Sequence, residues 1–164
     1  MTKMRLKRLL FYLSIATVFA VAKQTIAAGP TVLSVTATVL SKSVCKFQTK
    51  ASALAFGNLV PSSGANVTAV TTIGFVCNGS APNATFLMTK NNGLNGTGPG
   101  NNRMRHATLL SEFIPYSASL SPSSATVPKG VVQTLTVTGT VNALDYQNAA
   151  IGSYSDAVII TITP

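Results

Sequence analysis

Few side chains in this sequence could carry out chemistry. The 164 residues include one histidine, two cysteines and three carboxylates, which are Glu112, Asp145 and Asp156. A blue-copper site needs two histidines beside its cysteine, so His106 cannot complete one. Two cysteines and one histidine also fall short of the four ligands of a structural zinc site. We therefore predict no metal and no cofactor.

The sequence offers few residues for a catalytic pair of carboxylates. Asp145 and Asp156 are separated by 11 positions (156 − 145) around a loop, and a glycosidase-like pair is the one arrangement they offer. We instead expect Asp156 to accept hydrogen bonds from backbone donors at the start of the last strand. His106, in "RMRHA", is expected at an exposed strand end, and Tyr154 is expected to be a packed corner residue. The sequence predicts a protein that is not an enzyme.

The positive charge is concentrated at the N-terminus. Five of the twelve basic residues lie in the first 23 positions, and the other seven (12 − 5) face three acids without forming a basic stripe. This distribution argues against nucleic-acid binding. The basic "MTKMRLKR" and the apolar "LLFYLSIATVFAVA" are typical of a secretory signal peptide, cut after Ala22, Ala27 or Ala28. The alternative is an N-terminal membrane anchor, but the apolar run is short for a bilayer span.

Export determines the expected oxidation state of the two cysteines. In an oxidising compartment, Cys45 and Cys77 are expected to form a disulfide. Closing a loop of about 32 residues stabilises a fold by roughly 3 to 4 kcal/mol in the chain-entropy model. The sequence therefore predicts a covalent link between the segments that hold these cysteines.

Four Asn-x-Ser/Thr triplets begin at Asn66, Asn78, Asn83 and Asn95. In a eukaryotic secreted protein such triplets accept glycans. In a chain rich in Asn, Ser and Thr they also arise by chance, and we interpret them as incidental.

The elements that hold these residues are predicted to be β-strands. Glutamate occurs once, and the last two thirds of the chain are rich in Val, Thr, Ile, Ala and Gly, which favours strands over long helices. Strand patterns occupy residues 31–40, 53–56, 67–77, 84–90, 108–120 (broken at Pro115), 131–141 and 156–163. Residues 91–102 and 142–155 read as loops. Short strands separated by turn signals predict an all-β sandwich.

The last strand pattern raises a structural problem. "DAVIITITP", from Asp156 to Pro164, reads as a core strand, and no further strand pattern follows to cover its second edge. Residues 31–40, "TVLSVTATVL", form a spare strand with one apolar face, made of Leu33, Val35, Ala37 and Val39. This strand runs almost directly into the region of Cys45, so it cannot return to the far edge of its own domain. The sequence predicts an open edge and an unused strand.

Several segments, taken in order, resemble the spore coat protein U-like domain, a family that includes secreted pilins of archaic chaperone–usher systems. They are the alternating N-terminal strand, "SVCKF", "LAFGN", "IGFVC", an Arg-Met pair after the Gly-rich loop, "IPYSASL" and "GSYSDAVIITI". The resemblance spans about residues 31–163. It implies an immunoglobulin-like β-sandwich that lacks its last strand and has a groove beside its terminal strand. A periplasmic chaperone fills such a groove first, and the N-terminal strand of the next subunit replaces it in the fibre.

Two features depart from related pilins. The chain ends in Thr163-Pro164, where many pilins carry an aromatic residue near the terminus. The stretch 117–130 is unusually rich in Ser and Pro, and the resemblance gives it no role.

The resemblance divides the chain into a signal peptide (1–28), a donor-strand segment (29–41) and a pilin domain (42–164). The donor residues are Leu33, Val35, Ala37 and Val39, and the acceptor groove includes Val158, Ile160 and Ile162. The predicted protein is a structural subunit of a bacterial surface fibre, exported to the periplasm and then to the cell surface. Its predicted partners are a periplasmic chaperone, an outer-membrane usher and neighbouring subunits, and its predicted roles are attachment and biofilm formation.

The alternative is a secreted or tip-located adhesin or lectin-like binding module. A tip adhesin usually needs an additional receptor domain and has no use for its own donor strand. The spare strand at residues 31–40 therefore favours the polymerising subunit.

Overall fold

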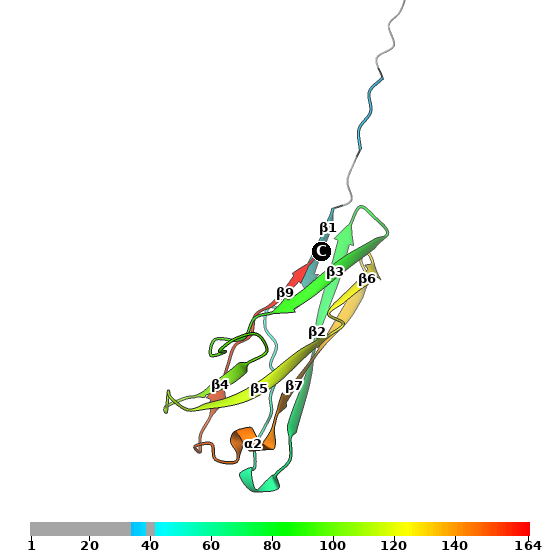
Figure 1. Ribbon diagram of the computed structural model, residues 1–164. Coiled ribbons are helices and arrows are strands. Elements are labelled where there is room, and N and C mark those ends of the chain that lie inside the picture. The colour runs from blue at the N-terminus through cyan, green and yellow to red at the C-terminus, as the bar shows by residue number, and fades with distance from the viewer. Residues whose placement is uncertain (1–33, 39–41) are drawn as a thin grey trace, which may run out of the picture. The chain divides into compact units, whose positions relative to one another are not determined.

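Residues 34–38 and 42–164 are described by the computed structural model of the chain (Figure 1). The chain divides into an N-terminal unit, residues 1–38, and a second unit, residues 39–164. The second unit is all-β and contains two antiparallel sheets, which confirms the all-β part of the predicted fold class. It also contains one short α-helix, α2 (Ala143–Tyr146), and one 3-10 turn, η1 (Pro61–Ser63), within its described part.

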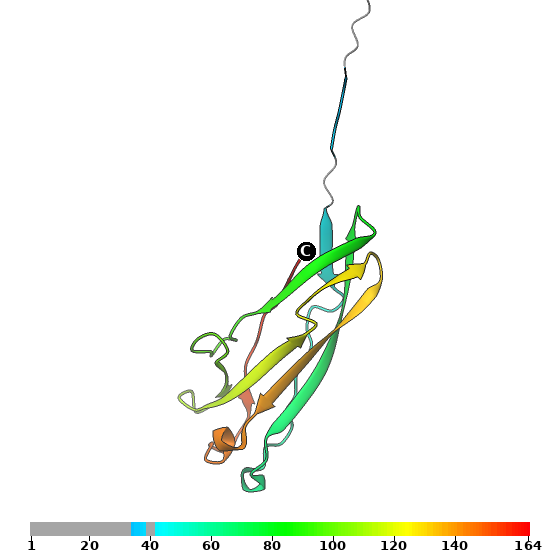
Figure 2. The same ribbon diagram turned by 45° about the vertical axis from the view of Figure 1, so that its right-hand side comes forward.

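The larger sheet has six strands and the smaller has three. The order in the larger sheet is β1 (Ser43–Phe47), β2 (Val67–Gly79), β7 (Val132–Val141), β5 (Phe113–Ser121), β4 (Asn102–His106) and β8 (Tyr154–Ser155). The order in the smaller sheet is β6 (Ser124–Pro128), β3 (Asn83–Lys90) and β9 (Ile160–Thr163). Figures 1 and 2 show β9, the last strand, alongside β3 and at the edge of its sheet.

The core lies between the sheets because alternate residues of each strand point inward. Phe75 on β2 and Phe86 on β3 are fully buried and meet edge to face, with ring centroids 4.8 Å apart. Leu135 on β7 is buried in the same cluster. A second cluster gathers around Val141 and Tyr146. Partly buried apolar side chains surround both clusters, and several of them line the site described below.

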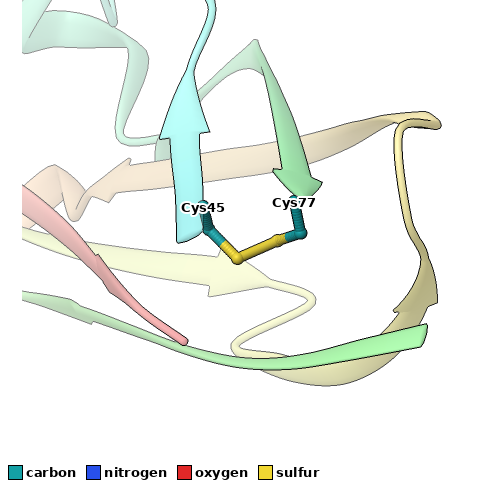
Figure 3. Close-up of a disulfide and its surroundings, with 2 residues drawn as sticks. All are labelled: Cys45 and Cys77. Atoms are coloured by element: carbon teal, nitrogen blue, oxygen red, sulfur yellow. A yellow bond between two sulfur atoms is a disulfide. The ribbon is translucent and has the colours of Figure 1, made fainter. Parts of the chain in front are cut away.

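Cys45 and Cys77 form a disulfide, as the sequence predicted. The two residues face each other directly in the antiparallel register of β1 and β2 (Figure 3). Both are buried against the core cluster that contains Phe75. The disulfide therefore attaches the edge strand β1 to its neighbour β2 in the larger sheet.

Replacing both cysteines, Cys45→Ser with Cys77→Ser, is expected to lower the free energy of unfolding by roughly 3 to 4 kcal/mol. The disulfide closes a loop between two residues with a sequence separation of 32. Without it, the unfolded chain has more conformational freedom, which stabilises the unfolded state. Urea unfolding of the oxidised wild type and the double variant measures the difference, with the reduced wild type as the control. Equal unfolding midpoints for all three would contradict this role.

Two strand predictions and one loop prediction need correction. Residues 53–56 form no strand, although Leu54 and Phe56 alternate with exposed neighbours as they would in one. The segment has the alternating burial of a strand, but it has no ladder partner within the described residues. In the last predicted strand, 156–163, residues 156–159 are irregular and β9 begins at Ile160. The predicted loop 142–155 contains α2 and β8.

Pro115 does not break its strand, and it lies within β5. It pairs with Arg103, while the ladder between β5 and β7 begins two residues later, at Ser117. The N–H that proline lacks would point to this unpaired side, so the strand loses no ladder hydrogen bond there. Three further strands were not predicted, namely β1, β4 and β6, and β6 lies in the Ser/Pro-rich stretch.

Candidate functional site

The last strand has one open edge. β9 pairs with β3 and, within the described residues, with no other strand. Just before it, the Asn91 N–H donates to the Ile159 carbonyl at 3.0 Å, and the Ile159 N–H donates to Asn91 Oδ1 at 2.9 Å. Backbone groups of successive strand residues point to opposite edges. Those of Val158, Ile160 and Ile162 therefore point away from β3.

These open backbone groups belong to residues whose side chains face inward. Val158, Ile160 and Ile162 are half-buried, whereas Ile159 between them is 64% exposed. No hydrogen bond outside the ladders reaches the backbone of the three half-buried residues in the described part of the chain. The arrangement could accept one more strand, which would bond to this edge and pack on the same side chains.

A groove of about 680 Å³ lies beside this edge. One wall is the segment from Tyr154 to Ile160, and the opposite wall is formed by residues of 47–56. The floor includes side chains of β2, β5 and β7, namely Ile73, Ala118, Leu120 and Val137. Of the three predicted acceptor residues, Val158 and Ile160 line this groove, and Ile162 packs against the neighbouring core cluster.

A second hollow of about 580 Å³ adjoins the groove. It is walled by residues of 54–61 and 149–154, and it shares four lining residues with the first: Leu54, Phe56, Met104 and Tyr154. The two hollows thus follow the same pair of chain segments. Together they line a longer stretch of these segments than either hollow alone, as an extended peptide requires.

The wall opposite the last strand was missed as a site by sequence reasoning. Leu54 and Phe56 point to the groove, and both pack over Gly139 on β7. A Cβ atom at Gly139 would lie 2.6 Å from Leu54 Cδ2 and 2.8 Å from Phe56 Cζ, so the glycine permits this close approach. The "LAFG" segment could have indicated this wall. Its apolar residues alternate as in a strand, and the sequence predicts no strand that pairs with it.

A hydrogen-bonded polar cluster contributes to the groove lining. Tyr116 Oη donates a hydrogen bond to Asp156 Oδ2 at 2.8 Å, and Lys90 Nζ donates to Asn102 Oδ1 at 2.9 Å. Lys90, Tyr116 and Asp156 line the groove, and Asn102 is fully buried. Burial, followed by the hydrogen bond to Asp156 and its charge, raises the pKa of Tyr116 well above its ordinary value. The phenol therefore stays protonated and remains a donor.

Asp156 also holds the Gly-rich loop 91–101. Its Oδ1 accepts from the backbone N–H of Leu94 at 2.9 Å, the N–H of Asn95 at 3.3 Å and Nδ2 of Asn95 at 3.2 Å. Gly93 has a φ of +78°, and a Cβ atom there would overlap the Asp156 carboxylate. The backbone donors expected for Asp156 thus exist, and they come from this loop. The carboxylate fixes the loop against the start of the last segment.

His106 is buried, with 5% of its surface exposed, which corrects the expected exposed position. Its Nδ1 accepts from the N–H of Thr108 at 3.1 Å and of Leu109 at 2.9 Å, so its Nε2 donates to the Ile151 carbonyl at 3.0 Å. Its ring meets Tyr154 edge to face, with centroids 4.9 Å apart. Both nitrogens are occupied, and the histidine is a structural residue.

The other candidates for chemistry lie apart from the groove. Asp145, in α2, accepts a hydrogen bond from Asn142 Nδ2 at 2.9 Å. Across residues 34–38 and 42–164, no group of three or more His, Cys, Asp or Glu side chains could hold a metal ion. In the same residues, no helix is long and apolar enough to cross a bilayer.

The predicted donor strand falls partly outside the described residues. Val35 is 81% exposed and Ala37 is exposed, in a segment, 34–38, without regular secondary structure. Leu33, Val39 and the predicted signal peptide (1–28) lie outside the described residues. The donor role of these four side chains stays a prediction.

Comparison with known proteins identifies one family. The model of the Spore Coat Protein U domain matches residues 31–161. No curated protein matches the sequence. This chain resembles a chain in a solved structure of a chaperone-tip adhesin complex, which is described as vital for synergistic activation of CFA/I fimbriae biogenesis. The two chains share 16% sequence identity, and the TM-score is 0.46. The similarity covers 74% of this chain and 41% of that chain, so this chain spans about two fifths of the other's length.

Proposed function

The chain belongs to the Spore Coat Protein U domain family, and on this basis we propose that it is a structural subunit of a bacterial surface fibre. The family is a fimbrial structural family without enzymatic activity. In our proposal the subunits join by donor-strand exchange, in which each groove receives the N-terminal strand of a neighbour. Attachment and biofilm formation are the roles that we assign to the fibre.

The observation that carries this proposal is the groove between two chain segments whose groove-side edges have no ladder partner within the described residues. The segment with Leu54 and Phe56 forms one wall, and the segment with Val158 and Ile160 forms the other. Neither wall has a ladder partner on the groove side within the described residues. An exposed strand edge beside apolar side chains aggregates unless another chain pairs with it. The groove is thus suited to one added strand.

Residues 31–40 have the pattern that such a strand needs. Leu33, Val35, Ala37 and Val39 recur at period two, so they share one face of an extended chain. Burying the three larger side chains at ~1.5 to 3 kcal/mol each gives roughly 5 to 9 kcal/mol per junction before ordering costs. We propose an antiparallel orientation relative to β9. All strand pairs of the second unit's described part are antiparallel, and antiparallel pairs are slightly more stable per residue.

The same groove must be occupied by a chaperone before assembly. We propose that the chain is exported to the periplasm after removal of its signal peptide, where a chaperone occupies the groove. An outer-membrane usher then exchanges the chaperone for the donor strand of the next subunit. The fibre is thus expected at the cell surface.

This proposal is tested by expressing the mature chain in a periplasm with and without the chaperone. Alone, the chain is expected to aggregate, self-polymerise or be degraded, since its open edge lacks a partner. With the chaperone, it is expected to yield a soluble one-to-one complex, as measured by size-exclusion chromatography with light scattering. A chain of residues 42–164 that is stable and monodisperse without any partner would contradict an incomplete sandwich.

A further inference from the structure

The inward row of the last segment changes character at Asp156. From the C-terminal side, the half-buried residues are Ile162, Ile160 and Val158, all apolar, followed by a carboxylate at 156. We propose that the polar cluster of Lys90, Asn102, Tyr116 and Asp156 sets the register of the incoming strand, by receiving a hydroxyl side chain of a second copy of this chain. This inference rests on the proposed function and adds the register in which the donor pairs with the last segment.

The cluster has hydrogen-bonding capacity that the subunit does not use. A carboxylate oxygen has about two acceptor sites, and Asp156 Oδ2 accepts one hydrogen bond, from Tyr116. The Lys90 ammonium has three N–H donors, and one of them reaches Asn102 Oδ1. Asn102 Nδ2 has no partner in the described residues, but the side chain is fully buried and does not line the groove, so the capacity open to an occupant is that of Asp156 and Lys90. An occupant that both donates and accepts would suit this part of the groove better than an apolar one.

The donor sequence offers such a residue at the correct spacing. The face that carries Val35, Ala37 and Val39 continues to Ser41, which is the first hydroxyl residue after the apolar series. In an antiparallel pair the sum of the two residue numbers is constant. Placing Ser41 beside Asp156 pairs Val39 with Val158 and Ala37 with Ile160. Apolar side chains then meet apolar ones, and the hydroxyl can donate to Asp156 Oδ2.

The neighbouring register that keeps the same face inward is shifted by two residues. It places Val39 beside Asp156 and brings an apolar side chain against a carboxylate that already accepts four hydrogen bonds. Covering this polar cluster with an apolar group removes water without replacing its hydrogen bonds, which is unfavourable. In the shifted register Leu33 lies beside Ile162, whereas in the proposed register it lies beside Pro164, past the end of β9. The polar cluster is therefore the feature that favours the proposed register.

The experiment uses synthetic peptides of residues 31–42 and the mature chain purified with its chaperone. Release of the chaperone reports the exchange of each peptide into the groove. Ser41→Thr retains a hydroxyl, and Ser41→Val has nearly the same shape as that threonine without it. We expect the Val peptide to bind about tenfold more weakly than the Thr peptide, the usual effect of losing a hydrogen bond to a charged group. Thr31→Val, at the far end of the same face, is the matched control and is expected to change binding by less than about twofold.

The outcomes separate this inference from the proposed function. If the wild-type peptide displaces the chaperone and the two Ser41 peptides bind equally, the register assignment is wrong and donor-strand exchange stands. If the wild-type peptide fails to bind while the chaperone complex is intact, the donor assignment itself is wrong. A Val39→Ser peptide that binds more tightly than wild type would place residue 39 at the polar cluster and would also overturn the register. The peptide changes leave the subunit untouched, so its folding is not affected.

Discussion

Val35→Asp is expected to abolish fibre growth. The side chain is 81% exposed in the lone chain, so the substitution leaves the subunit's own fold intact. In the fibre it would face a neighbour's groove at Ile162 or Ile160, where a buried, unpaired carboxylate costs several kcal/mol. Fibre yield is expected to fall at least about a hundredfold. Electron microscopy and immunoblotting of sheared surface material measure this yield.

Thr36→Asp is the matched control, because it places the same charge one residue away on the outer face. It is expected to change fibre yield by no more than about twofold, as surface substitutions do. Both variants should still form the chaperone complex, since the groove of the subunit is unchanged. If the two substitutions reduce fibre yield equally, or neither does, residues 31–40 are not the donor strand.

Ala118→Phe is expected to close the groove from its floor. Ala118 is half-buried on β5 and lines the groove, so a phenyl ring there takes the space of an incoming side chain. Inserting bulk into a well-packed contact costs about 1 to 3 kcal/mol, which corresponds to a loss of affinity of about fivefold to 150-fold. Chaperone binding and fibre growth should both fall, in contrast to Val35→Asp. Pull-down of the chaperone and fibre yield measure the two effects.

Ser119→Phe controls for the added ring. Ser119 is the next residue of β5 and is exposed on the opposite face of the sheet. It should leave chaperone binding and fibre growth within about twofold of wild type. Equal loss in both variants would indicate general misfolding, and normal chaperone binding by Ala118→Phe would show that this hollow is not the acceptor groove.

Local patterns in the sequence predicted much of the fold. Alternation in residues 67–77 and 131–141 identified β2 and β7, and the disulfide between Cys45 and Cys77 is present as predicted. The same alternation identified the inward row of the last segment, where Val158, Ile160 and Ile162 are half-buried. These features depend on burial of one face, which leaves a period-two signal in the residues themselves.

The rest of the site depended on contacts between distant segments. Residues 53–56 have the side-chain pattern of a strand, but a ladder also requires a partner, and the groove lies where that partner would be. His106 looked exposed because its neighbours are polar, whereas its burial depends on Ile151 and Tyr154. The link from Asp156 to Tyr116 spans 40 positions, and no local pattern shows it. Long-range polar contacts of this kind leave no periodic trace in a sequence.

The central claim is that a strand is added at the open edge of the last segment, and amide hydrogen exchange in assembled fibres tests it most directly. The N–H groups of Ile159 and Thr161 point to β3, whereas those of Val158, Ile160 and Ile162 point to the open edge. A bonded amide exchanges far more slowly than one left in water. We predict that all five amides exchange slowly in the fibre. An alternating pattern, with Val158, Ile160 and Ile162 still exchanging fast, would show that no strand occupies this edge.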